Sequence, residues 1–168
     1  MRRFLDGLYR FSGALAAFFL LAIGVSILAQ IVGRFFGKIV DSTELAGFCL
    51  AASSFLGLGY TLRGGGHIRV NMLVIRFTGK SRRAFELWCC AVAASVTGFL
   101  SVSAALFVWQ TYTFGDISPG LLAAPFWIPQ TGMVLGLIIM TVALVDDLLC
   151  VARGQTPSYE ANSRGALE

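Results

Sequence analysis

Side chains that could take part in acid–base chemistry or ion binding are few in this chain, and most flank long apolar stretches. Glu44 opens one such stretch, and Asp146 and Asp147 close another. Neighbouring residues on a helix point in different directions, so we expect Asp146 and Asp147 to form a solvated helix end instead of a catalytic pair. His67 is the only histidine, and one histidine cannot supply both axial ligands of a bis-histidine haem.

The cysteines and glycines form no recognisable cofactor or metal motif. None of the four cysteines belongs to a C-x-x-C pair, so the sequence predicts neither a zinc site nor a redox pair. We expect the cysteines to pack as small apolar side chains. The glycine run over residues 64–66 lacks the lysine of a phosphate-binding loop. The sequence therefore predicts no catalytic residue, no bound metal and no cofactor.

The composition is that of a membrane protein. Hydrophobic residues make up 57% of the chain and charged residues only 13%, where a soluble domain has about 25% charged. Four stretches contain no Asp, Glu, Lys or Arg: residues 11–33, 45–62, 87–115 and 117–145. A helix needs about 20 mostly apolar residues to cross roughly 30 Å of hydrocarbon. The sequence therefore predicts an all-α integral membrane protein with transmembrane helices near residues 11–33, 44–62, 82–113 and 129–150.

The distribution of positive charge predicts the topology. All but two of the 13 Lys and Arg residues lie in the amino end, in the connection between the second and third spans, or near the carboxyl end. The two exceptions are Arg34 and Lys38. Because cytoplasmic segments carry the excess of Lys and Arg, we expect an N-in/C-in arrangement with both termini in the cytoplasm. The net charge of +4 thus gives no sign of nucleic-acid binding.

We expect residues 1–153 to form a single four-helix membrane domain and residues 154–168 a disordered cytoplasmic tail. Within the connection over residues 64–80, residues 67–72 alternate polar and apolar side chains, which alone would suggest a strand. A lone strand leaves backbone groups unpaired beside lipid, so we favour a helix. On a helix, Arg69, Arg76 and Lys80 share one side. The sequence therefore predicts an amphipathic helix on the cytoplasmic surface, with its cations toward anionic inner-leaflet lipids.

The middle of the predicted spans offers hydroxyl groups but no ionisable side chain. Residues such as Ser53, Ser101 and Thr141 are expected to pack helices together or to bond to their own backbone. The G-x-x-x-G pair of Gly132 and Gly136 is likewise expected to serve packing within the chain. A transporter that grips a charged substrate needs polar or ionisable groups near mid-membrane, and this chain has none there.

Polar groups gather instead at the non-cytoplasmic ends of the spans, in Gln30, Glu44, Gln110 and Gln130. In the predicted topology these residues lie at similar depth. We expect them to form a cluster of interhelical hydrogen bonds, with Arg34 pairing with Glu44 across the first hairpin. The alternative is a contact surface for a partner on the outer side of the membrane.

One stretch resembles a known family. Residues 62–71, LRGGGHIRVN, follow the second span. They are similar to the Arg-x-Gly-Gly-His-Ile/Val-Arg-Val stretch of the small membrane subunit of tripartite ATP-independent periplasmic (TRAP) transporters. An acid that opens the second span, here Glu44, and a Pro-x-Trp approach to the fourth, here residues 125–127, are similar as well. The resemblance covers roughly residues 5–153.

The resemblance implies a non-catalytic small permease subunit in the bacterial inner membrane, which is not an enzyme. Its implied partners are a large, sodium-coupled membrane subunit that moves like an elevator, and a periplasmic binding protein that delivers organic acids. The small subunit would hold part of the large subunit fixed as a scaffold. The residues expected at a partner or lipid interface are Arg34, Glu44, Arg63, His67, Arg69, Arg76 and Trp127.

Two other functions are alternatives on the sequence. An independent small exporter working as an oligomer would need a membrane-embedded acid, and Glu44 is the only candidate. A membrane anchor for a redox enzyme would need more histidine than His67 alone supplies.

Overall fold

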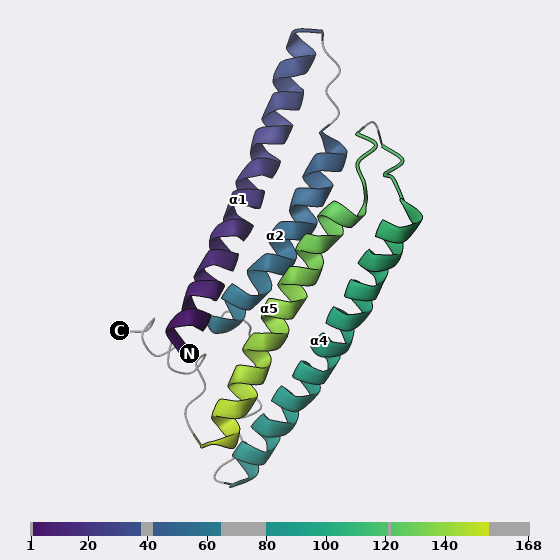
Figure 1. Ribbon diagram of the computed structural model, residues 1–168. Coiled ribbons are helices and arrows are strands. Elements are labelled where there is room, and N and C mark those ends of the chain that lie inside the picture. Colours follow the sequence, from purple (N-terminus) through teal and green to yellow (C-terminus); the bar gives the residue numbers. More distant parts are fainter. Residues whose placement is uncertain (1, 38–41, 65–79, 121, 155–168) are drawn as a thin grey trace, which may run out of the picture.

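The computed structural model describes residues 2–37, 42–64, 80–120 and 122–154 and places most of them in four long α-helices (Figure 1). The helices are α1 (Arg2–Phe35), α2 (Thr43–Arg63), α4 (Lys80–Phe114) and α5 (Trp127–Ala152). Each is long and apolar enough to cross a membrane, so the predicted all-helical fold with four candidate spans is confirmed. The predicted surface helix and the predicted tail fall almost entirely outside the described residues.

The four helices lie side by side in the order α1, α2, α5, α4 (Figure 1). The last helix of the chain thus sits between the second and the third. Burial follows this order, because 50% of the most apolar window of α5 is buried, against 28% for α2 and 11% for each of α1 and α4. The centre of the fold is therefore α5, with α1 and α4 at its two edges.

The fold has two distinct ends. At the first, called the Arg63 end, α1 and α4 begin and α2 and α5 finish; at the second, called the Glu44 end, α2 and α5 begin and α1 and α4 finish. With 34 and 35 residues, α1 and α4 measure roughly 50 Å, which exceeds the hydrocarbon thickness of about 30 Å. They must tilt or project from the layer. At the Glu44 end, α1 extends past the start of α2 (Figure 1).

Glycines bring α2 and α5 into close contact. A Cβ added at Gly136 would clash with the backbone of Phe55, and one added at Gly59 would lie 2.7 Å from the Ile139 side chain. Gly132, one turn before Gly136, also lies against α2. The G-x-x-x-G pair therefore serves packing inside the chain, as predicted. Close backbone approach matters here because lipid provides little hydrophobic drive for one helix to bind another.

Hydroxyl groups join the edge helices to the inner ones. Ser12 of α1 donates to a backbone carbonyl of α2, and Ser53 of α2 donates back to the Ala16 carbonyl oxygen at 2.9 Å. Ser101 of α4 and Thr141 of α5 are hydrogen-bonded to each other at 3.0 Å. The prediction that mid-span hydroxyls serve helix packing is confirmed for Ser53, Ser101 and Thr141.

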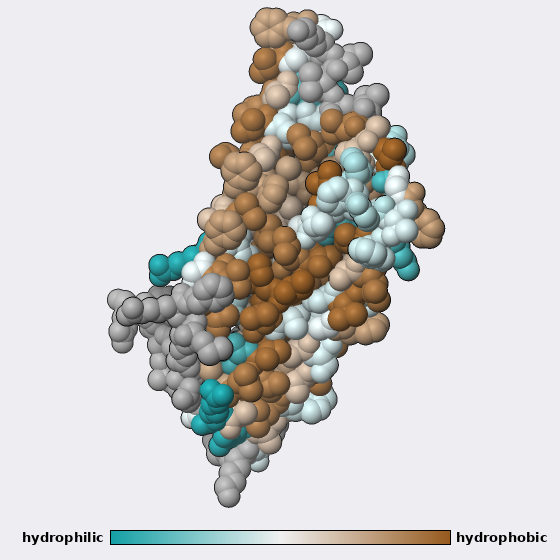
Figure 2. Space-filling view, viewed as in Figure 1, coloured by the Kyte–Doolittle hydropathy of each residue, from teal (hydrophilic) through white to brown (hydrophobic). Residues whose placement is uncertain are grey.

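Apolar side chains run across the face shown in Figure 2 between the two ends. On the edge helices, Phe18, Leu21, Phe99 and Leu106 are each at least 60% exposed. A soluble protein does not leave so many large apolar side chains exposed, because apolar patches of this size associate with other molecules in water. The edge helices therefore need lipid, or a partner's helices, against them.

Candidate functional site

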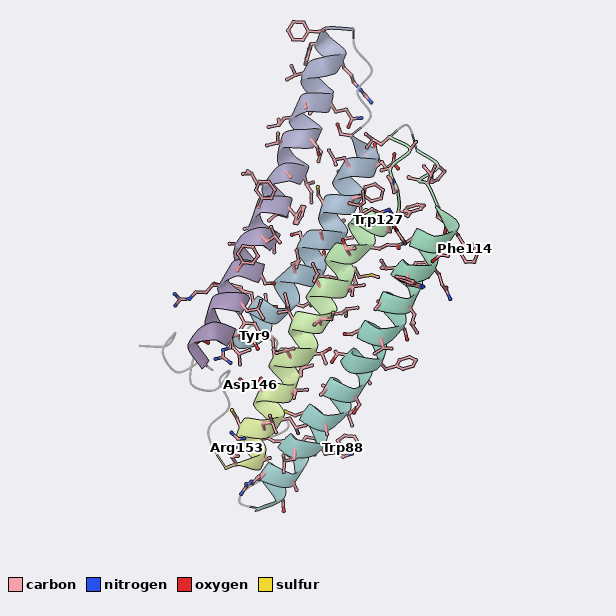
Figure 3. The ribbon with its side chains drawn as sticks, in the orientation of Figure 1. Tyr9, Trp88, Phe114, Trp127, Asp146 and Arg153 are labelled. Carbon is pink, nitrogen blue, oxygen red and sulfur yellow. The ribbon has the colours of Figure 1, made fainter. Side chains whose placement is uncertain are left out.

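Arg63, the last residue of α2, connects three helices at the Arg63 end. Its Nη2 lies 2.5 Å from Asp6 Oδ1 of α1, and its Nη1 lies 3.2 Å from Asp146 Oδ2 of α5. Its guanidinium carbon lies 5.2 Å from the ring centre of Tyr9, which is labelled near Asp146 in Figure 3. We call these four residues the Arg63 cluster. Only 15% of the Arg63 side chain is exposed, so its interactions are screened less than those of a surface ion pair.

Two acids that were expected in solvent belong to this end of the fold. Asp147 is 2% exposed, and Asp146 is paired with Arg63, so the prediction of a solvated helix end was wrong. The reason is the central place of α5, whose last turns pack against residues of α1, α2 and α4. Sequence reasoning also missed Asp6 and Tyr9. A usable signal was present, because Asp6 is the only acid before the first span and lies one helical turn from Tyr9.

A second arginine caps the central helix at the same end. Arg83 of α4 donates hydrogen bonds to the carbonyl oxygens of Val151, at 3.3 Å, and Ala152, at 2.7 Å. The last carbonyls of a helix have no partner within the helix and carry partial negative charge. Arg83 therefore satisfies two of these carbonyls and ties α4 to α5.

At the Glu44 end, one carboxylate fastens the connection between α4 and α5 to α2. Glu44 Oε2, in the first turn of α2, accepts a hydrogen bond from the Leu122 backbone amide at 3.2 Å. A Cβ at Gly120 would overlap this carboxylate, so a larger residue there would displace the Glu44 side chain from this position. The connection is a hairpin, formed by residues 115–120 and 122–126, in which Phe126 N donates to Asp116 O at 3.1 Å. Glu44 thus acts as a latch between α2 and this hairpin.

The predicted cluster of Gln30, Glu44, Gln110 and Gln130 is wrong. No hydrogen bond joins any two of them, although all four lie in the described part of the chain. The Oε1 atoms of Glu44 and Gln130 are instead buried without a partner. The predicted Arg34–Glu44 pair is also absent among the described helices, because α1 runs past the start of α2 (Figure 1). Arg34, in the last turn of α1, is exposed.

Among the other predicted interface residues, Trp127 is the first residue of α5. Its ring packs edge-on against that of Tyr112, with ring centres 5.7 Å apart. Figure 3 places Trp127 at the Glu44 end of α5. Three further predicted residues, His67, Arg69 and Arg76, lie outside the described residues, so their proposed contact with lipid or a partner stays a prediction. Within the described ranges, no three His, Cys, Asp or Glu side chains form a group that could hold a metal ion.

Four apolar helices side by side, with the ionisable groups confined to the two ends, define a multi-pass membrane protein. Residues 23–154 match the family model of the tripartite ATP-independent periplasmic transporters, DctQ component. The chain belongs to this family, as the small permease component of a TRAP transporter, and the family is not one of enzymes.

A curated relative is the C4-dicarboxylate TRAP transporter small permease protein DctQ of Rhodobacter capsulatus. It is 28% identical over 124 residues, which are 73% of this chain and 54% of the relative. The chain thus spans about half the length of that relative. No solved structure matches the chain.

The geometry of Glu44 predicts how to distinguish two roles of this residue: a structural latch, and an acid that carries protons or ions during transport. Glu44→Gln keeps an oxygen that accepts the Leu122 amide, so we expect transport by the complete transporter to stay within about twofold of wild type. Glu44→Ala removes the acceptor and should lower the melting temperature by a few degrees, since a hydrogen bond contributes about 1 kcal/mol. Transport assays and thermal unfolding of both variants check this. Transport lost in Glu44→Gln without a change in melting temperature would contradict the latch.

Proposed function

We propose that this chain is the non-catalytic scaffold of a TRAP transporter. It holds a large, sodium-coupled, elevator-type membrane subunit in place while that subunit imports organic acids delivered by a periplasmic binding protein. The observation that carries the proposal is the lack of charged side chains in the middle of the membrane-spanning helices. The described spans carry no Asp, Glu, Lys, Arg or His between their two ends, and their mid-span hydroxyls Ser53, Ser101 and Thr141 bond to neighbouring helices. Such spans can support a neighbour but offer nothing to bind an anion.

The shape of the surface supports a large apolar partner. A single row of helices leaves both broad sides and both edges uncovered, unlike a closed bundle. One side carries an apolar groove of about 450 Å³ between α1, α2 and α5, with Phe19, Phe48 and Leu135 among its lining residues. Helices of a second membrane subunit can pack against such a surface through van der Waals contact.

The substrate class and orientation are parts of the same proposal. The relative from Rhodobacter capsulatus is named for C4-dicarboxylates, which supports a carboxylate-type substrate for the transporter. We place both termini and the Arg63 end in the cytoplasm of a bacterium, with the chain in its inner membrane. Arg10, Arg83 and Arg153 flank the spans at that end, while Arg34 stands at the other. The Glu44 end then faces the periplasm, where a binding protein would arrive.

Co-purification tests the scaffold role. A tagged copy of this chain should bring down a large multi-span subunit in mild detergent, and deletion of the chain should abolish uptake of the substrate by cells. Re-expression of the chain from a plasmid is the control that restores uptake. Full uptake by the large subunit in the deletion strain would overturn the scaffold, and transport by this chain alone in liposomes would favour an independent exporter.

A further inference from the structure

A pocket lies beside the hairpin at the Glu44 end, and the scaffold function proposed above gives it no role. It has a volume of about 400 Å³ and lies between the end of α4, the hairpin and the start of α5. Its lining residues are Phe107, Thr111, Asp116, Ile117, Phe126 and Gln130. Apolar walls and a few polar groups at one place are typical of a binding pocket.

Two acceptors of this pocket, on Gln130 and Asp116, lack donors. Gln130 Oε1 is buried and has no hydrogen-bond partner. The Asp116 side chain is exposed at the rim, and within the described residues its carboxylate takes part in no hydrogen bond or ion pair. The Thr111 hydroxyl cannot supply the missing donor, because it donates to the Phe107 carbonyl oxygen of its own helix at 3.0 Å. The pocket therefore favours a group that carries several N–H donors and positive charge.

The acceptors stand on a firmly held backbone. Asp116 N donates to the Thr111 carbonyl oxygen at 3.2 Å, and Asp116 O accepts from Phe126 N at 3.1 Å. The Glu44 latch holds the other arm of the same hairpin through the Leu122 amide. A site whose groups are fixed before binding loses less entropy when a partner arrives, so this pocket is suited to recognition.

We propose that the pocket receives an arginine side chain of the soluble periplasmic binding protein; this rests on the function and orientation proposed above. The methylene stem of an arginine would pack along Phe107, Ile117 and Phe126, as long cationic side chains do on apolar walls. Its planar guanidinium would bond the Asp116 carboxylate and, once the amide rotates toward the pocket, the Gln130 oxygen. The contact would make docking specific and dependent on salt.

Affinity of the binding protein for the complete transporter tests this inference. This chain and its large subunit are reconstituted together in nanodiscs, and the dissociation constant of the binding protein is measured at low and moderate salt. Asp116→Asn should weaken binding about tenfold, and Asp116→Arg should weaken it further. Gln130→Glu should strengthen binding, because it adds a second negative charge to the pocket. Thr113→Arg is the matched control: it changes the net charge as much as Asp116→Asn does, at an exposed position outside the pocket lining.

The outcomes separate this inference from the proposed function. A charge-swap series in which an Arg→Asp variant of the binding protein recovers affinity only for Asp116→Arg would identify the bonded pair. Unchanged affinity in both Asp116 variants, with an intact transporter, would overturn the docking pocket and leave the scaffold standing. Loss of tightly bound phosphatidylethanolamine from Asp116→Asn, measured by native mass spectrometry without a change in affinity, would instead assign the pocket to a lipid headgroup. A chain that binds no large subunit at all would overturn the scaffold itself.

Discussion

Gly136→Ala should destabilise the fold by about 2–3 kcal/mol, in the upper part of the range of roughly 1–3 kcal/mol for forcing extra atoms into a packed contact. The added Cβ would meet the backbone of Phe55 and lie 2.8 Å from Leu56 N, and a backbone cannot rotate aside as a side chain can. The only relief is to move α5 away from α2, which also disturbs the contact that links the α1 and α4 edges of the row. Thermal unfolding in detergent, followed by the reactivity of the buried thiols Cys49 and Cys90, measures the loss.

Two other glycines supply matched controls for Gly136→Ala. Gly24→Ala in α1 adds the same methyl group where no atom lies within 4 Å, so stability should stay equal or rise slightly from the better helix propensity of alanine. Gly59→Ala meets the Cγ2 methyl group of Ile139 at 2.7 Å, a side-chain atom where Gly136→Ala meets backbone, so its loss should fall between the other two. Equal melting temperatures for Gly136→Ala and Gly24→Ala would show that the close α2–α5 contact contributes nothing to stability.

The presence of the four helices was predictable, but their order was not. A charged side chain in hydrocarbon has a high free-energy cost, so the absence of charge over residues 11–33 and 117–145 strongly predicts a membrane span in each. In lipid, however, a buried face and an exposed face are both apolar, so the amphipathic pattern that reveals neighbours in soluble proteins is missing. The G-x-x-x-G of α5 indicated close packing and left its partner open. Only the contacts place α5 between α2 and α4.

Side-chain contacts at the ends of the helices were also hard to predict from the sequence. Glu44 stands out in the sequence as the acid that opens the second span, yet its partner is the Leu122 backbone amide, which has no sequence signature. Arg34 was assigned to Glu44 by sequence proximity, and the extra length of α1 separates them. The Arg63 cluster joins residues from three distant segments, so local spacing could pair Asp6 with Tyr9 but could not place Arg63 and Asp146 beside them.

Arg63→Met should cost the fold roughly 2–3 kcal/mol. Removing one partner from a shielded ion pair leaves the other charge uncompensated, which costs about 3–5 kcal/mol when both groups are fully buried. The value here should be lower, because the side chains of Asp6 and Asp146 are 47% and 23% exposed and water can solvate them in part. Arg10→Met is the matched control, since Arg10 is an exposed arginine near the start of α1. The melting temperatures of the two variants, measured side by side in the same detergent, give the contribution of the cluster.

A triple variant that also removes the two negative charges separates two causes of the destabilisation in Arg63→Met: carboxylates left without a counter-ion, and the lost stacking of Arg63 on Tyr9. If Arg63→Met destabilises mainly by leaving two carboxylates without their counter-ion, then adding Asp6→Asn and Asp146→Asn should recover at least half of the lost stability. If the arginine acts mainly through its stacking on Tyr9, the two asparagines should recover nothing, because the ring contact stays lost. Arg63→Met with the stability of Arg10→Met would mean that the cluster does not hold α1 and α5 to the end of α2.

Since α1 is an edge helix that packs mainly on α2, we expect its first turns to become accessible to protease in Arg63→Met before the rest of the chain unfolds.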